Sequence, residues 1–357
     1  MSNTATPNIS SLSLTSGIQS HCCWYCGRGE DALPTKLQKC GRCGLAEYCN
    51  RECQRRDWKL HKAKCKHLTE IVVDTDVENR LRSGALKRRL LTLSKGIVIL
   101  TIRDPDITTI GDMNLTEERV REAPFVGCKS ILRVDLKGCT KLISVGNFAF
   151  WNCSSLTSLV LPDCLTQVGR LAFGKCSSLT SVVLPNSLTQ LNDGAFAGSS
   201  SLTSVVLPDS LTQLGDGAFG ACSSLTSVVM SYSLTSVGTG AFQDCPSLTS
   251  VVLPDSLTQL GDAAFSQCTS LTSVVLPDCL TQVGRLAFGK CSSLTSVVLP
   301  DSAELGDDVF DECDALLQKA TLAGFDSVEP YLRDRYKSMT RSYKSISLGK
   351  LVPNPYF

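Results

Sequence analysis

A hydrophobic pattern that recurs every 23 residues, from about residue 97 to residue 313, restricts the fold more than any other feature. Phenylalanines show the period most clearly: Phe150, Phe173, Phe196, Phe219, Phe242, Phe265 and Phe288. Phe125 and Phe310 continue the series with slips of two residues and one, and leucines and most of the cysteines keep the same period. Such a period is typical of a solenoid, in which each unit buries its apolar edge only by stacking on the next.

One unit, LTSVVLPDSLTQLGDGAFGACSS, indicates how a coil is built. The segment 202–207 has the L-x-x-L-x-L pattern of a short strand, and 211–214 predicts a second extended segment before a turn at Gly215. The apolar residues of 218–222 predict one helical turn that closes a three-sided coil. With strands ~4.8 Å apart, eight or nine such units would make a rod of about 40 Å. We therefore predict a β-rich solenoid of 23-residue repeats.

A cysteine-rich stretch precedes the repeats and carries paired spacings that suit metal ions. Its four pairs are Cys23 and Cys26, Cys40 and Cys43, Cys49 and Cys53, and His61 and Cys65. A gap of two or three residues lets one turn offer two donors to one ion, so eight donors indicate two closed, structural zinc sites. The spacing leaves open whether the pairs join sequentially or crosswise. Cys22 offers a competing pairing with Cys26, and disulfides are the alternative to zinc.

These motifs, together with Tyr48-Cys49, Cys53-Gln54, Asp57-Trp58 and His61-Lys62, resemble the MYND zinc finger over about 43 residues. The resemblance implies interleaved ligands, with Cys23, Cys26, Cys49 and Cys53 on one zinc and Cys40, Cys43, His61 and Cys65 on the other. It also implies that the finger docks short peptides, often proline-rich ones. Gln54 and Trp58 would be groove residues, and a strand at 45–48 would be the edge that pairs with the peptide. Trp58 could instead form the small core of the finger.

The repeats resemble the BspA-like, Treponema-type class of leucine-rich repeats over residues 97–313, which implies a shape and not an activity. The outward strand positions are nearly constant, as in Thr203, Ser204 and Val206. The resulting valine column is either a contact surface or a solvated strand face inherited by copying. We predict that the repeat cysteines are small buried hydrophobes and not redox or metal sites.

The sequence divides into five segments. Residues 1–20 are predicted to be a disordered leader, 21–66 the finger, 67–96 a helical connector, 97–313 the repeats, and 314–357 a helical cap with a basic tail. Lys87, Arg88 and Arg89 in the connector form either a nuclear-import patch or a solvated helix face.

Charge and histidine content limit the possible functions. Residues 21–95 hold 17 Lys and Arg against 9 Asp and Glu, which keeps nucleic-acid binding open as an alternative. Thiolate ligands neutralise part of that surplus, so we do not expect nucleic acid to be the main partner. All three histidines lie at the finger, and no P-loop or dinucleotide-binding glycine pattern occurs. Some MYND proteins are methyltransferases with a split SET domain, but only 22 residues precede the finger and repeats follow it. The sequence therefore predicts no enzyme.

The sequence predicts neither a signal peptide nor a membrane-spanning segment. The first twenty residues contain no Lys or Arg, and the longest strongly apolar run is 97–102, too short to cross a bilayer. We predict a zinc-binding adaptor for protein partners, located in the cytoplasm or nucleus, with no membrane partner. Its repeats would be a second binding platform or a spacer. The alternatives are a nucleic-acid-associated regulator and a purely structural repeat protein.

Overall fold

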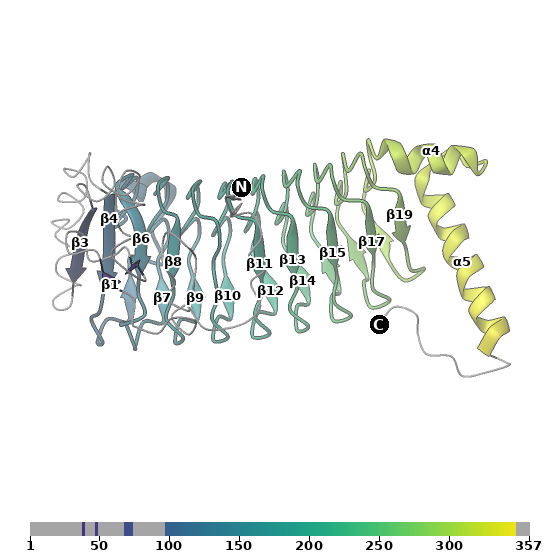
Figure 1. Cartoon of the computed structure of the whole chain (residues 1–357). Coiled ribbons are helices and arrows are strands. Elements are labelled where there is room, and N and C mark those ends of the chain that lie inside the picture. Colours follow the sequence, from purple (N-terminus) through teal and green to yellow (C-terminus); the bar gives the residue numbers. More distant parts are fainter. Residues whose placement is uncertain (1–37, 40–46, 49–67, 74–96, 348–357) are drawn as a thin grey trace, which may run out of the picture. The chain divides into compact units, whose positions relative to one another are not determined.

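The computed structural model describes residues 38–39, 47–48, 68–73 and 97–347 of a chain that divides into two compact units, residues 1–69 and 70–357. In the first unit, the described strands β1 (Gln38–Lys39) and β2 (Glu47–Tyr48) pair antiparallel. The second unit stacks the repeats one behind another and ends in two helices (Figure 1).

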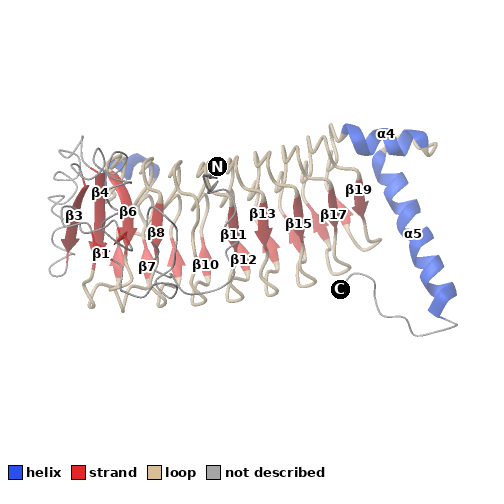
Figure 2. Ribbon diagram, in the orientation of Figure 1, coloured by secondary structure: helices blue, strands red, loops and turns tan. Residues whose placement is uncertain are grey.

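Most coils of the second unit contribute one short strand to each of two rows, and from β4 onward the paired strands are parallel (Figure 2). The first row consists of β3 (Leu68–Val73), β4 (Ile97–Ile102), β6 (Ile131–Asp135), β8 (Ser158–Val160), β11 (Ser204–Val206), β13 (Ser227–Val229), β15 (Ser250–Val252), β17 (Ser273–Val275) and β19 (Ser296–Val298). The second row consists of β5 (Thr109–Ile110), β7 (Ser144–Val145), β9 (Gln167–Val168), β10 (Gln190–Leu191), β12 (Gln213–Leu214), β14 (Ser236–Val237), β16 (Gln259–Leu260), β18 (Gln282–Val283) and β20 (Glu304–Leu305). Isolated bridges at Leu159–Val182 and Ser181–Ser204 connect β8 to β11.

Each residue of a strand pairs with the residue one repeat further along the chain, as the 23-residue period predicts. Val205 pairs with Val228, and Val228 pairs with Val251. Side chains alternate across each strand, so Val205 is buried while Ser204 and Val206 face outward. Threonine hydroxyls strengthen the stack, because Thr226 Oγ1 donates to the carbonyl of Thr203 at 3.0 Å and the pattern repeats along the array. The two extended segments predicted for each coil are confirmed.

The third side of each coil differs from the expectation of a helical turn. Residues 218–222 form hydrogen-bonded turns and no helix. Gly217 and Ala221 adopt left-handed backbone conformations, both with φ of 57°, and such residues interrupt a right-handed helix. Alternate N–H groups, at Gly217, Phe219 and Ala221, donate to carbonyls of the next coil at 2.7–2.8 Å. The apolar spacing of this segment fits a helical turn equally well, which is why the prediction was wrong.

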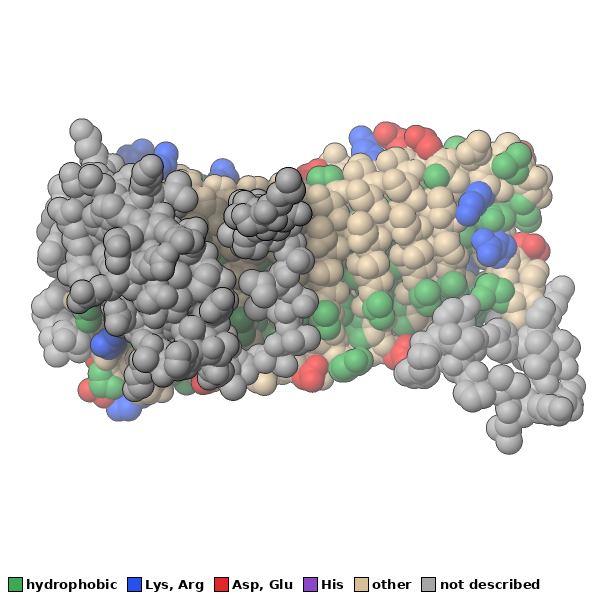
Figure 3. Space-filling model, viewed as in Figure 1, with side chains coloured by type: hydrophobic (Ala, Val, Ile, Leu, Met, Phe, Trp, Pro, Cys, Tyr) green, Lys and Arg blue, Asp and Glu red, His purple; other side chains and the backbone are tan. Residues whose placement is uncertain are grey.

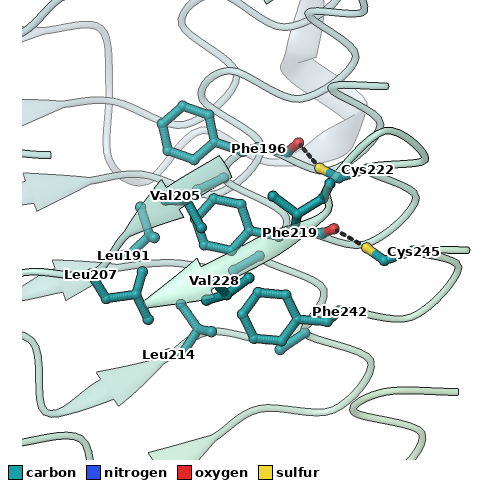
Figure 4. Close-up of a cluster of buried hydrophobic side chains, with 14 of the residues drawn as sticks. Leu191, Phe196, Val205, Leu207, Leu214, Phe219, Cys222, Val228, Phe242 and Cys245 are labelled. Carbon is teal, nitrogen blue, oxygen red and sulfur yellow. Dashed lines mark hydrogen bonds between the residues drawn. The ribbon is translucent and has the colours of Figure 1, made fainter. Parts of the chain in front are cut away.

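The core is a column of stacked phenylalanine rings. Nine rings from Phe125 to Phe310 follow one another with centroids 4.7–5.8 Å apart and planes within 15° of parallel. Figure 4 shows three of them beside two cysteines, and the Cys245 thiol donates to the carbonyl of Phe219 at 3.3 Å. Leucines and valines of both strand rows complete this interior. The predicted burial of the periodic repeat cysteines is confirmed.

Glycines after the second strand set how closely the coils approach. A Cβ added to Gly261 would lie 2.6 Å from the carbonyl carbon of Gly238 and from the nitrogen of Thr239. These contacts are with backbone atoms of the preceding coil, which cannot move without separating the sheet. A glycine is therefore needed here for close packing and not for an unusual backbone angle.

The connector predicted as helical over 67–96 begins instead with a strand, β3. Its sequence, LTEIVV, is rich in β-branched residues, which favour strands. Val73 is fully buried, and its carbonyl accepts the N–H of Arg103 at 2.9 Å. The first row of strands therefore starts before the first recognisable repeat. The rest of the predicted connector, residues 74–96, lies outside the described residues.

The C-terminal end of the array carries α4 (Asp314–Leu322) and α5 (Val328–Ser347), as Figure 2 shows. The predicted capping helix is confirmed, and α5 extends into what the sequence suggested was a tail. Val328, Tyr331 and Leu332 join the core. Polar contacts attach the helices to the last coils: Lys319 Nζ donates to the Thr295 carbonyl at 3.0 Å, and the Tyr336 hydroxyl donates to Asp278 at 3.1 Å.

At the other end of the described array, a 3-10 helix, η2 (Glu117–Glu122), covers a small apolar cluster formed by Leu115, Ala123 and Phe148.

Candidate functional site

The described strands of the first unit bracket part of the predicted zinc site. β1 and β2 pair with Gln38 opposite Tyr48 and Lys39 opposite Glu47. In the sequence, Cys40 and Cys43 therefore stand between β1 and β2, and Cys49 directly follows β2. The short sequence between two paired strands is a suitable place for a C-x2-C motif that offers two thiolates to one ion. This donor set, soft sulfur with one imidazole, fits zinc.

The predicted ligands and groove residues lie outside the described residues, so the structure does not place them. They are Cys23, Cys26, Cys40, Cys43, Cys49, Cys53, His61 and Cys65 for zinc, and Gln54 and Trp58 for a peptide. Of the edge predicted at 45–48, the structure describes the last two residues, which form β2. The ligand assignment and the peptide groove therefore stay predictions.

The buried repeat cysteines have unreactive thiols, whereas Cys279 is exposed, against the prediction that the repeat cysteines are buried. Burial raises the pKa of the thiols of Cys176, Cys245 and Cys291 to about 12. A thiol with such a pKa stays protonated near neutrality, and the protonated form is neither a nucleophile nor a good metal ligand. Within residues 72–73 and 99–339, where side chains are described, no group of three His, Cys, Asp or Glu side chains is placed to hold a metal ion.

The outer face of the first strand row carries a line of exposed valines in an uncharged surface. We call Val183, Val206, Val229, Val252 and Val275 the valine stripe; they are 82, 60, 55, 81 and 51% exposed. Each follows the motif Thr-Ser-Val, so hydroxyl side chains border the stripe on one side. Figure 3 shows this face, with hydrophobic side chains in a band beside uncharged polar surface.

The outer face of the second strand row is a shallow polar groove near its C-terminal end. The groove is lined by strand residues, by glycines, and by the residues that follow those glycines: Ser236, Gln259, Gln282, Glu304, Gly238, Gly261, Gly284, Asp216, Thr239, Asp262, Arg285 and Asp307. The carboxylates of Asp216 and Asp262 accept the backbone N–H groups of Thr239 and Arg285, both at 2.7 Å.

Asn147, at the equivalent position, accepts the N–H of Arg170 at 2.8 Å. An amide oxygen can therefore take the place of the carboxylate in this contact, and the contact does not require a charge. Sequence reasoning missed this groove, although the recurrence of Gln before the glycine and of Asp after it was a visible signal.

Two family descriptions match the chain. The BspA type leucine rich repeat region matches in six copies over residues 107–225 and 189–317, and the MYND finger matches residues 23–65. Both predicted resemblances are confirmed.

Curated relatives share only the finger region. The rat N-lysine methyltransferase SMYD2 is 38% identical over 82 residues, which is 23% of this chain and 17% of the relative. SET domain-containing protein 14 of Caenorhabditis elegans is 48% identical over 42 residues, 12% of this chain and 10% of the relative. The chain thus spans less than a fifth of the length of these relatives, and the similarity does not extend to a SET domain.

Solved structures similar to the array are also repeat proteins. A leucine rich cell surface protein of Faecalibacterium prausnitzii covers 58% of this chain and 69% of its own, with 24% identity and a TM-score of 0.42. The T. pallidum leucine rich repeat protein covers 65% and 86%, with 25% identity and a TM-score of 0.32.

Fold and finger together define a zinc-finger repeat protein, a combination of two modules that generally serve protein–protein interaction. The chain belongs to the BspA type leucine rich repeat family and carries a MYND zinc finger ahead of the repeats. No helix in the described part of the chain is long and apolar enough to cross a membrane.

Proposed function

We propose that this protein is a zinc-dependent adaptor, whose finger docks short proline-rich peptides and whose repeat array is a second binding platform or a spacer. The observation that carries the proposal is the presence of a MYND finger and a long repeat array in one chain. The array has two extended faces and buried, protonated thiols, which supports binding and not chemistry. All three histidines lie at or before residue 67, so the repeats contain no imidazole base.

The finger holds two zinc ions with interleaved ligands. Cys23, Cys26, Cys49 and Cys53 bind one ion, and Cys40, Cys43, His61 and Cys65 bind the other. The β1–β2 pair supports this arrangement, because in the sequence β2 stands between Cys49 and the pair formed by Cys40 and Cys43. Interleaving ties distant parts of a short segment together, which a module with little apolar surface needs in order to fold.

The peptide lies beside β2 and against Gln54 and Trp58. An extended peptide can add to the edge of a strand through its backbone, while an exposed aromatic side chain provides an apolar contact for prolines. In the described part of the first unit, β2 pairs along one edge with β1. The cysteine-rich chain with free thiols belongs in a reducing, intracellular compartment.

Zinc content and peptide capture test the proposal on the full chain. Mass spectrometry of the reduced protein should find two zinc ions per chain. Cys23→Ser and Cys40→Ser should each lower that number. Immobilised PxLxP-type peptides should retain the wild-type protein and the control variant Gln213→Ala. Gln54→Ala and Trp58→Ala should lose retention while keeping both zinc ions.

Two results would reject the adaptor role. If Trp58→Ala and wild type bind peptides equally, the groove assignment is wrong. If the full chain binds DNA or RNA with steep salt dependence and binds no peptide, the basic segment defines the function instead.

A further inference from the structure

The valine stripe breaks the usual alternation of a half-solvated sheet. On β11, β13, β15 and β17 the middle valine is buried and the next valine points outward. A sheet with one face in water normally places polar residues at such outward positions. Strand pairing aligns Val206 with Val229 and Val229 with Val252, so the exposed valines form one straight line.

We propose that the valine stripe is the contact surface for a second copy of this chain, and that the protein forms a reversible dimer through the outer face of its first strand row. This inference goes beyond peptide docking by the finger and does not depend on it.

Matching periods favour a second copy over a helix or an isolated peptide strand. Strands of the stripe are spaced by about 4.8 Å, and a partner must repeat at the same spacing to pack an apolar group between each pair of valines. A second copy has that spacing by construction. A helix or an isolated peptide strand repeats at a different distance and would lose register after a few contacts.

Charge also favours this face. Residues 150–313 hold 4 Lys and Arg against 14 Asp and Glu, so two arrays repel each other over most of their surface. The strand segment LTSVVL or LTSVVM is uncharged in all six units from residue 179 to 299. Two copies can therefore approach through it without burying a carboxylate.

Two-fold symmetry can set valine stripe against valine stripe in two ways. An axis parallel to the strands makes the two arrays antiparallel, and an axis along the arrays makes them parallel. In both arrangements two acidic arrays meet, with exposed carboxylates of the turns beyond the stripe, such as Asp209, Asp255 and Asp278, at the edge of the contact. Salt should therefore strengthen the dimer, because it screens these like charges and leaves the apolar contact intact.

The size of the face indicates a transient dimer. Six strands at ~4.8 Å and about four residues at ~3.3 Å give roughly 400 Å² per copy, below the ~800 Å² of a standard stable interface. A dimer with so small an interface forms only at high protein concentration. It would bring two fingers into one particle and raise the avidity for any ligand that carries two docking peptides.

Sedimentation equilibrium of the full, zinc-loaded chain tests the proposal. Over about 1 to 200 μM, the average mass of the wild type should rise toward twice that of the monomer. The rise should begin at lower concentration when NaCl increases from about 0.1 to 1 M. The triple variant Val206→Thr, Val229→Thr, Val252→Thr keeps β-branched side chains and should weaken association about a hundredfold.

Controls separate this surface from others. The triple variant Gln213→Thr, Gln259→Thr, Gln282→Thr changes the second strand row and should dimerise like wild type. If the valine triple variant does not fold, Val252→Thr alone should weaken association several-fold. A wild type that stays monomeric throughout, or a folded valine variant that dimerises unchanged, would overturn the proposal. Peptide capture by the finger is measured separately, so either idea can fail alone.

Discussion

Replacing Phe219 with alanine tests whether the ring column is the main source of stability in the array. Phe219 is fully buried and stacks on Phe196 and Phe242, with both centroid distances 5.6 Å. Truncation leaves a cavity that the neighbouring rings cannot fill, because coil spacing holds them apart. We expect a loss of about 3–5 kcal/mol. The loss of stability should lie in the upper half of this range, since two ring contacts of about 0.5–1.5 kcal/mol each disappear.

Phe310→Ala is the matched comparison, at the end of the described column. Phe310 is 9% exposed and stacks on Phe288 at 5.8 Å. One ring contact is lost instead of two, and the partly open site can relax, so we expect a cost about 1–2 kcal/mol smaller.

Urea unfolding followed by far-ultraviolet circular dichroism measures both costs, provided that the dependence on urea is unchanged. Benzene should restore part of the stability of Phe219→Ala, because an apolar cavity between two rings can bind it. Equal costs for the two variants, or a cost below about 1.5 kcal/mol for Phe219→Ala, would refute the argument that the column is the main stabilising element.

Three further changes test other parts of the fold. Gly261→Ala should destabilise the array by about 1–3 kcal/mol in urea unfolding, since its Cβ would meet backbone atoms at 2.6 Å. Gly217→Ala has open space but a φ of 57°, and should cost about 1 kcal/mol. Ala263→Gly should raise the melting temperature, because Ala263 has a φ of 51°; a decrease would show that the strain is absent. Iodoacetamide at about pH 8 should label exposed Cys279 before buried Cys245. Burial raises the pKa of Cys245 from 9.0 to about 12, so its contribution to stability is complete below pH 9 and is lost as the pH rises toward 12; a flat alkaline stability curve would contradict this.

Several parts of the fold were predictable because they depend on residue spacing. The 23-residue period indicated a solenoid with two strands per coil, and the sheets confirm both. The regular positions of Cys beside Phe and Leu indicated buried residues, which the burial of the periodic cysteines confirms, whereas the stacking of the rings was not predicted. Periodicity determines which side chains share a face, whatever the details of the backbone.

Other features depended on contacts that spacing does not reveal. The segment 218–222 was predicted as helical. Its left-handed residues prevent a helix, and its backbone hydrogen bonds join it to the next coil along the third side of the solenoid. β3 was predicted as part of a helical connector, but its β-branched residues complete the first strand row. The second-row groove needs glycines and carboxylates from several coils at once, so no single repeat indicates it.

The sequence alone determined the class of protein, since metal-ligand spacing and a long repeat period can be seen directly in the sequence and are compatible with few folds. Tertiary structure alone decided which backbone groups bond between coils and how much of each outward side chain reaches solvent. Two valines adjacent in the six units from residue 179 to 299 show the reason: Val205 is 2% exposed and Val206 is 60% exposed. The residue type is the same, and only the direction of the side chain across the sheet makes one a core residue and the other a surface.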